Sequence, residues 1–317
     1  MSFEALLGNA RLKENLSRSI ASNHISHFYL ISGPVGSGRH TLARLLAAAI
    51  LCQGKNKPCL SCNPCRKVTA NIHPDFITVD DPEKKTVSVE LVRQARADMY
   101  VQPNESDHKI YLFPRAQDMR TEAQNALLKI LEEPPKYGVF ILLTDNPERL
   151  LPTVRSRCTE LSLAPLEENI LRDALKREFP ETSAEDIAAA MARSGGFLGQ
   201  AKQLLAEGTA LPPQTAEFAA AFAARDSFSI ARLMATLEKQ KRDQLMPLLE
   251  EWVQLLENSL AYRCGMSAVS AAARDIGTRR SPRDLMAAIE ALQKAIHYAQ
   301  GNISPGAVCG WLAWELR

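Results

Sequence analysis

The sequence predicts an α/β protein in which a doubly wound parallel sheet is followed by all-helical segments. Apolar strand-like runs alternate with helical patterns as far as residue 163, as a parallel sheet with crossover helices requires. A glycine-rich turn separates the first such run from a helix, which is typical of a phosphate-binding loop. After Ala164-Pro165 the strand signals stop and helical periodicity takes over.

The elements of the sheet region are short and apolar. Four residues at helical spacing form one face of a first helix: Leu6, Leu12, Leu16 and Ile20. Nearly continuous apolar runs, typical of strands covered on both faces, predict strands at Phe28–Ile31, Phe76–Val79, Ile110–Phe113 and Phe140–Thr144. Helices are expected at Thr41–Leu51, Val89–Met99 and Thr121–Leu131. Pro134-Pro135 ends the last of these helices.

Proline and glycine divide the remaining chain. Short helices are expected over 164–208, and Leu211-Pro212-Pro213 marks a second boundary. Two apolar stripes with helical period then predict the core of a bundle: Leu245, Leu249, Trp252, Leu256 and Leu260, followed by Leu285, Ile289, Leu292, Ile296 and Ala299. We therefore predict three domains, at 1–163, 164–208 and 209–317.

Charge and composition exclude several classes of protein. The 317 residues include 38 basic and 36 acidic side chains, a net charge of +2. This balance argues against a strongly basic nucleic-acid binder. The N-terminal residues lack the features of a signal peptide, and no apolar run reaches the length of a membrane span. We expect a cytoplasmic protein without a membrane partner.

The turn after the first strand has the frame of a phosphate loop but not its working side chains. Gly33, Gly36 and Gly38 keep the glycine spacing that lets backbone N–H groups and a helix N-terminus hold a phosphate. Active loops continue with Lys and Ser or Thr, which bind the outer phosphates and Mg²⁺. Here Arg39 and His40 occupy those places. These two residues still allow weak ATP binding through the backbone of the loop, but they argue against ATP hydrolysis.

The second half of an ATP site is also missing. A strand ending in Asp-Glu would supply the carboxylates that hold Mg²⁺ and polarise water. After the strand at Ile110–Phe113, Pro114 and Arg115 stand in those positions. Asp118 lies further on and is expected to cap the following helix. The chain is therefore not expected to be an ATPase by itself.

Four cysteines within 14 residues predict a metal site: Cys52, Cys59, Cys62 and Cys65. Four thiolates can close a tetrahedron around a structural Zn²⁺. An iron–sulfur cluster is the rival, because C-x2-C-x2-C also occurs in ferredoxins, although here the fourth Cys lies upstream. Unliganded loop cysteines are the least favoured alternative.

Ser156-Arg157-Cys158 lies near the end of the sheet region. An Arg at the edge of such a domain can extend into a neighbouring subunit and stabilise the γ-phosphate of its nucleotide. The alternative is that this Arg lies in a solvated loop or forms an ion pair within its own chain.

With these motifs, the chain resembles the delta-prime family of bacterial DNA polymerase III subunits, which are AAA+ proteins of the clamp loader. The resemblance runs from Leu7-Gly8-Asn9 to the C-terminus. It is densest between residues 28 and 165, where Asn71–Asp75 and Asn125–Pro135 also match. The gamma and tau motor subunits share the second of these motifs and Ser156-Arg157-Cys158.

The resemblance implies a RecA-like AAA+ module with a zinc module at 52–65, then a helical lid and a helical collar. The collar would join gamma, tau and delta subunits in a ring that loads a sliding clamp on primed DNA, within the DNA-directed DNA polymerase III holoenzyme. Arg157 matches the family's finger, supplied in trans. Gly199 takes the place of the lid's sensor Arg, a third departure from an active site. Two alternatives remain, an active motor of the gamma or tau type and a zinc-dependent nucleic-acid binder.

Overall fold

The chain forms two compact units in the computed structural model, which describes residues 3–207, 211–266, 270–301 and 303–316. The first unit runs to Ile170 and also includes Phe197–Gln200. The second unit consists of Leu171–Gly196 and the chain from Ala201 onward. The three-domain division stays a prediction, because its boundary at residue 208 lies outside the described residues.

A five-stranded parallel sheet forms the centre of the first unit, in the order β2-β3-β4-β1-β5. Its strands are β1 (Phe28–Ser32), β2 (Phe76–Thr78), β3 (Lys109–Phe113), β4 (Gly138–Thr144) and β5 (Thr159–Ser162). The first four confirm the predicted strands. The fifth was not predicted, because β5 is a short edge strand whose Thr, Glu and Ser side chains are exposed and give no apolar run.

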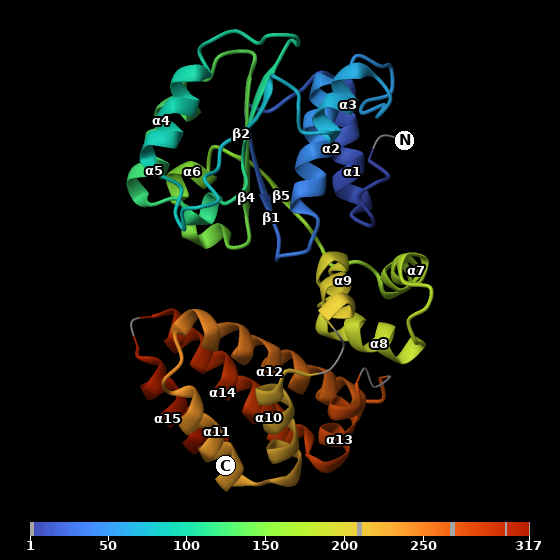
Figure 1. Ribbon diagram of the computed structural model, residues 1–317, viewed down its shortest axis with the longest axis vertical. Coiled ribbons are helices and arrows are strands. Elements are labelled where there is room, and N and C mark those ends of the chain that lie inside the picture. Colours follow the sequence, from blue (N-terminus) through green and yellow to red (C-terminus); the bar gives the residue numbers. More distant parts are fainter. Residues whose placement is uncertain (1–2, 208–210, 267–269, 302, 317) are drawn as a thin grey trace. The chain divides into compact units, whose positions relative to one another are not determined.

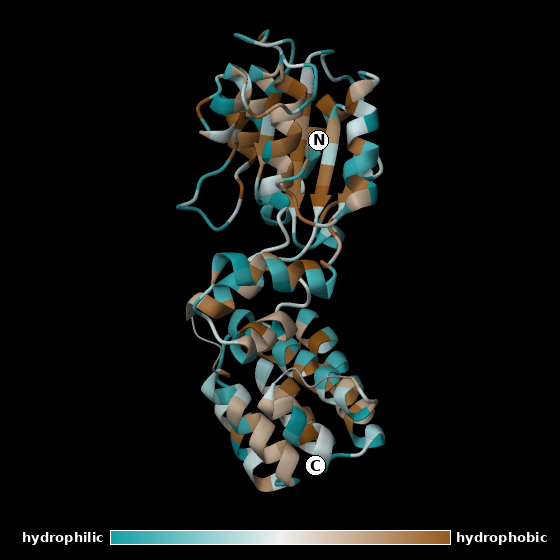
Figure 2. Cartoon of the chain, turned by 90° about the vertical axis from the view of Figure 1, so that its right-hand side faces the viewer, coloured by the Kyte–Doolittle hydropathy of each residue, from teal (hydrophilic) through white to brown (hydrophobic). Residues whose placement is uncertain are grey.

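Helices cover both faces of this sheet (Figure 1). One layer contains α1 (Ala10–Ala21), α2 (Arg39–Leu51) and α3 (Asn63–Thr69); the other contains α4 (Val89–Asp98), α5 (Thr121–Glu132) and α6 (Pro152–Arg155). Because side chains alternate along a strand, Tyr29 and Ile31 pack with the first layer and Phe28 and Leu30 with the second. The strands are therefore apolar on both faces (Figure 2). Leu6 is buried as expected, but it precedes α1.

The rest of the chain is helical, and the predicted α/β class with a helical C-terminal region is confirmed. The helices are α7 (Glu168–Glu178), α8 (Ala184–Arg193), α9 (Leu198–Glu207), α10 (Pro213–Ala224), α11 (Ser227–Leu237), α12 (Arg242–Arg263), α13 (Ala271–Arg279), α14 (Pro282–Gln300) and α15 (Pro305–Glu315). Among the helices described, none has the length and apolar character to cross a membrane.

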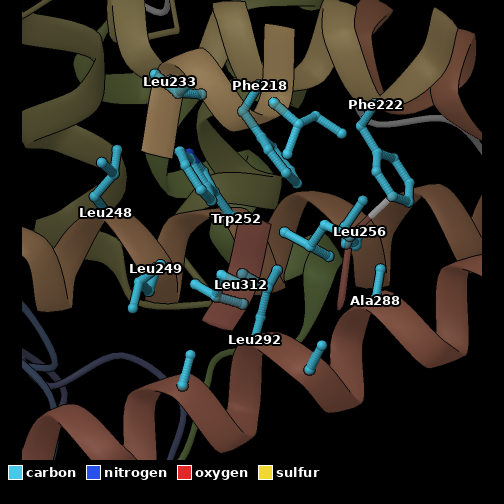
Figure 3. Packing of buried hydrophobic residues seen from close by; sticks show 14 of the residues in the cluster. Phe218, Phe222, Leu233, Leu248, Leu249, Trp252, Leu256, Ala288, Leu292 and Leu312 are labelled. Atoms are coloured by element: carbon cyan, nitrogen blue, oxygen red, sulfur yellow. The ribbon is translucent and has the colours of Figure 1, made fainter. Parts of the chain in front are cut away.

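The core of the helical region confirms the predicted stripes. Leu245, Leu249 and Leu256 on α12 are buried, and Leu285 and Leu292 on α14 are buried with them (Figure 3 labels Leu249, Leu256 and Leu292). At the centre, Trp252 stacks on Phe218 of α10 with ring centroids 4.1 Å apart. The indole N–H donates to the hydroxyl of Thr215 at 3.3 Å, which satisfies the one polar atom of this ring in an apolar core.

Candidate functional site

The phosphate-loop frame lies at the carboxyl end of β1, beside the carboxyl end of β4. The N–H of Gly33 donates to the carbonyl of Thr144 at 3.2 Å and fixes the start of the loop. Gly36 and Gly38 have φ angles of 78° and 97°, a backbone conformation that favours glycine. The loop leads directly into α2. The carboxyl edge of an open parallel sheet is where such folds place ligands, and the predicted glycine frame lies at this edge.

The two residues after the frame carry different chemistry from an active loop. Burial lowers the pKa of the half-buried Arg39, while the charge of Asp145 acts in the opposite direction. Its Nη1 atom has no hydrogen-bond partner among the described residues. Desolvation, followed by the charges of Arg39 and Arg44, lowers the pKa of His40. A guanidinium and a neutral imidazole therefore stand where Lys and Ser or Thr would act.

Arg115 occupies the end of β3 as a structural cation. Its Nε and Nη2 donate to Oδ1 of Asp80 at 3.0 and 2.6 Å, and Nη2 also donates to the carbonyl of Asp81 at 2.8 Å. Its Nη1 donates to the carbonyl of Lys84 at 3.0 Å. These bonds tie the segment after β2 to the end of β3. The positions of the two metal-binding carboxylates are thus taken by a proline and by a cation that is bonded within this chain.

Asp118 does not cap the next helix, and that prediction was wrong. It lies in the 3-10 turn η1 (Ala116–Asp118), and Arg120 precedes the first turn of α5. Burial raises the pKa of Asp118, although Arg149, whose Nη1 is 3.8 Å from Oδ1, counters this. The 3-10 turn ends at Asp118 and α5 begins at Thr121, as expected, so this carboxylate lies two residues before the capping position.

Phe197–Gln200 lies against the phosphate loop. The N–H of Gly199 donates to the carbonyl of Gly36 at 2.9 Å. Gly199 is the residue predicted to replace the sensor Arg of an active motor. The backbone itself makes the contact here, and no side chain is involved.

The four predicted metal ligands come together. Their sulfurs all lie within 4.8 Å of one another. Cys52 ends α2, Cys59 lies in the connecting loop, and Cys62 and Cys65 begin α3. The sulfurs of Cys52 and Cys62 are 3.9 Å apart. A tetrahedral site with Zn–S bonds of about 2.3 Å has edges of about 3.8 Å, so this cluster fits a four-thiolate metal site.

Backbone donors surround these sulfurs. The N–H groups of Gly54 and Cys59 donate to the sulfur of Cys52 at 3.3 and 3.4 Å, and the N–H of Cys62 donates to that of Cys59 at 3.3 Å. Hydrogen bonds from Ser61 first, and from the N–H of Cys62, lower the pKa of the Cys59 thiol to about 5. Burial raises the pKa of the Cys65 thiol. Donors to sulfur favour the thiolate form that a metal requires.

Arg157 lies on the surface after α6. Its Nη1 donates to the carbonyl of Thr153 at 3.0 Å, and its Nη2 is 3.4 Å from Oε1 of Glu132. The Arg157 side chain is 40% exposed and that of Glu132 58% exposed. Such a pair contributes about 0–1 kcal/mol, so the guanidinium can exchange this partner for another anion. Burial raises the pKa of the Cys158 thiol to about 12, which favours its neutral form.

Two polar residues that the sequence did not identify as functional hold this framework together. Buried Gln124 on α5 donates to the carbonyl of Arg149 at 3.1 Å and accepts from the N–H of Leu151 at 2.6 Å. It thereby fastens the segment that leads to Arg157. Fully buried Asp75 accepts four hydrogen bonds from the Asn104–Ser106 segment. The sequence did contain one signal for Gln124, because it is a polar residue on the apolar face of a predicted helix.

Comparisons with known proteins show which family this chain resembles. Residues 8–167 match the family described as "DNA polymerase III, delta subunit". A Bacillus subtilis protein named DNA polymerase III subunit delta' is 29% identical over 267 residues, which cover 84% of this chain and 76% of that protein. A Pseudomonas aeruginosa delta' subunit is 34% identical, over 58% of this chain and 57% of that protein.

A Buchnera aphidicola gamma subunit is 34% identical, over 56% of this chain and 50% of that protein. This chain thus spans about half the length of the Pseudomonas and Buchnera relatives. A solved structure of a gamma subunit-related protein from Thermotoga maritima has a TM-score of 0.43 at 15% identity, covering 95% of this chain and 97% of that one. Because the family match spans half of the chain, this protein belongs to the delta-prime-type clamp-loader family of DNA polymerase III.

Proposed function

We propose that this chain is a non-catalytic, stator subunit of the DNA polymerase III clamp loader in the bacterial cytoplasm. Its partners would be gamma or tau and delta subunits in a hetero-oligomeric ring, held together by the helical collar at 209–317. The ring would load a sliding clamp on primed DNA in an ATP-dependent reaction. This subunit would support that reaction without hydrolysing ATP.

The pairing of Arg115 with Asp80 is the observation that most directly supports the stator role. Hydrolysis needs carboxylates at the end of β3 to hold Mg²⁺ and to polarise water. Arg115 instead binds Asp80 through Nε and Nη2, at 3.0 and 2.6 Å. The cation is built into the fold at this point, which supports a lasting loss of the site. Arg39 and His40 are consistent with the same conclusion.

The proposed contribution to catalysis is Arg157, which would act in the ATP site of an adjacent subunit. Its exposure and its weak pairing with Glu132 support this role. A guanidinium stabilises charge that develops on a transferring phosphoryl group, and such a finger is worth about 10³–10⁵ in rate. Gln124 and the turn before α6 hold the backbone from which Arg157 extends.

We also propose that Cys52, Cys59, Cys62 and Cys65 hold one structural Zn²⁺. When bound, the ion would cross-link the end of α2 to the start of α3, and it would have no open position for catalysis. The gathering of the four sulfurs within 4.8 Å of one another, with those of Cys52 and Cys62 3.9 Å apart, supports this assignment. Structural zinc is coupled to folding of the segment that binds it.

A steady-state ATPase assay on the purified chain tests the stator role. The expected result is no turnover above background, with and without primed DNA. The similarity to gamma subunits keeps one alternative, an active motor that uses Asp118 in place of the missing carboxylates. Turnover by the isolated chain that is lost in an Asp118→Asn variant would establish that alternative and reject the stator role.

A further inference from the structure

Two glycines bring the phosphate loop and the start of α9 into direct backbone contact. The N–H of Gly199 donates to the carbonyl of Gly36 at 2.9 Å. A Cβ atom built on Gly199 would lie 2.6 Å from the Cα and 2.7 Å from the carbonyl oxygen of Gly36. A Cβ atom built on Gly36 would lie 2.4 Å from the backbone nitrogen of Gln200. These separations are far below van der Waals contact, so neither position has room for a side chain.

The two glycines are required for different reasons. Gly36 has a φ of 78°, so its backbone conformation alone favours glycine. Gly199 is not among the glycines with positive φ, and any residue can adopt its backbone conformation. What demands glycine at position 199 is therefore the close approach to Gly36. A sensor Arg at this position is therefore incompatible with the contact, because its Cβ atom would separate the two backbones.

The segment that makes this contact belongs to a different compact unit from the residues on either side of it. Phe197–Gln200 belongs to the compact unit of the sheet, whereas the residues that flank it on both sides, through Gly196 and from Ala201, belong to the helical unit. A segment of four residues is thus held on the sheet unit by its contact with the loop. The Oγ of Ser37, in the same loop, is buried without a hydrogen-bond partner among the described residues, as expected where protein covers the loop.

We infer that Phe197–Gln200 is a built-in latch on the phosphate loop. In a motor subunit, as the family resemblance implies, the lid carries a sensor Arg at this position. In this chain Gly199 stands there, and its backbone N–H donates directly to the carbonyl of Gly36. The start of α9 is therefore held in one position whether or not nucleotide is present. The inference deepens the proposed stator role, because it supplies a physical reason for a subunit that does not respond to ATP.

Hydrogen exchange on the full-length chain, followed by mass spectrometry, tests the latch. In the wild type, peptides covering 33–40 and 197–203 should be protected, and neither Mg²⁺-ATP nor Mg²⁺-ADP should change their exchange. In a Gly199→Ala variant the added Cβ must separate the two segments, and both peptides should exchange at least about tenfold faster. Peptides of β4 should keep their wild-type protection in the same sample, which shows that the sheet remains folded.

Gly310→Ala is the matched control, because a Cβ atom on Gly310 would meet no atom within 4 Å beyond its chain neighbours and the backbone of its own helix. Its exchange at 33–40 and 197–203 should equal that of the wild type. Two results would overturn the latch: protection of 197–203 in the wild type that rises on adding ATP, or Gly199→Ala exchange equal to that of the control. Both measurements use the isolated chain and do not depend on Arg157 or a ring. A result that rejects the latch therefore leaves the proposed role of Arg157 intact. A result that rejects the role of Arg157 likewise leaves the latch intact.

Discussion

The guanidinium of Arg115 and the carboxylate of Asp80 form a two-point hydrogen bond between the ends of neighbouring strands. Nε and Nη2 of Arg115 both donate to Oδ1 of Asp80, at 3.0 and 2.6 Å. Their side chains are only 27% and 21% exposed, so water screens this pair less than a surface ion pair. Arg115 is thus part of the framework at the end of β3, and its contribution to stability can be measured by mutation.

Arg115→Met should lower the free energy of unfolding by about 1–3 kcal/mol, because the carboxylate of Asp80 loses its partner in a partly buried place. Urea unfolding at neutral pH measures the change. Arg232→Met is the control, since Arg232 pairs with Glu217 on the surface, where the side chains are 61% and 41% exposed. The control should change stability by less than about 1 kcal/mol. Equal effects of the two variants would show that Arg115 is an ordinary surface residue.

Asp75→Asn should destabilise the protein by about 3 kcal/mol at neutral pH. The Oδ2 atom of Asp75 accepts from the N–H groups of Glu105 and Ser106 at 2.8 and 3.0 Å. An amide nitrogen in that place would face two donors. Oδ1 accepts from the backbone and side chain of Asn104. Loss of these bonds should release the segment before β3, which hydrogen exchange can detect.

This difference should depend on pH. Burial alone would raise the pKa of Asp75, but hydrogen bonds from Asn104, Glu105 and Ser106 hold it below its usual range. A carboxyl with a lowered pKa in the folded state stabilises fully above the unfolded pKa of about 3.9 and loses this effect as pH falls through the folded pKa. The gap between wild type and Asp75→Asn should therefore be constant from pH 5 to 7, an interval about one unit above that pKa, and shrink below pH ~4. A gap that does not shrink in acid would contradict the assignment. Asp173→Asn, on the exposed face of α7, is the control.

Much of the sheet could be predicted from sequence because parallel strands covered on both faces leave continuous apolar runs. Phe140–Thr144 is an example, and β4 is buried along its whole length. By contrast, β5 could not be predicted, because an edge strand is set by pairing with β1 and not by its own composition. Asp118 was misplaced for a similar reason. The 3-10 turn before α5 depends on tertiary contacts, so it could not be predicted from the preference of Asp for helix N-caps.

The parts of the candidate site that could be predicted are those whose residues lie close together in the sequence. Cys52 and Cys65 are close because one short loop and one helical turn bring them together. Contacts between distant segments leave no such signal. The sequence shows a glycine at position 199 where an active motor has Arg, but only the structure shows that the glycine contacts Gly36, far along the chain. The pairing of Arg115 with Asp80 is hidden in the same way.

The cysteine cluster should bind about one Zn²⁺ per chain, as a closed four-thiolate site does. Cys65→Ser should lower the zinc content and loosen the segment between α2 and α3, because metal binding is coupled to local folding. Trypsin should then cleave after Lys55 faster than in the wild type, while the sheet persists. Cys264→Ser removes an exposed thiol of the helical region and should leave zinc content and cleavage unchanged. Iron with visible absorption in the purified protein would reject the zinc assignment.

Arg157→Ala should slow ATP hydrolysis by a reconstituted clamp loader without destabilising this subunit. The pair with Glu132 is exposed and the two nitrogen–oxygen partners are 3.4 Å apart, so its loss should change the free energy of unfolding by less than about 1 kcal/mol. At the neighbouring ATP site, the rate should fall about 10³-fold or more, because the charge of the transferring phosphoryl group loses its stabilising guanidinium. The measurement is ATP turnover per assembled ring at matched concentration, with clamp and primed DNA present.

Two further variants separate a finger from a structural residue. Arg157→Lys keeps the charge but loses the planar fork, so it should restore little of the lost rate. Arg155→Ala removes an Arg that bonds Glu148 at 2.8 Å and Glu160 at 3.3 Å within this chain. It should loosen the loop after α6 and reduce turnover less than Arg157→Ala, because Arg155 is already engaged by its own carboxylates. If Arg157→Ala rings hydrolyse ATP at the wild-type rate, Arg157 is a surface residue and the stator role would have to act through the collar alone.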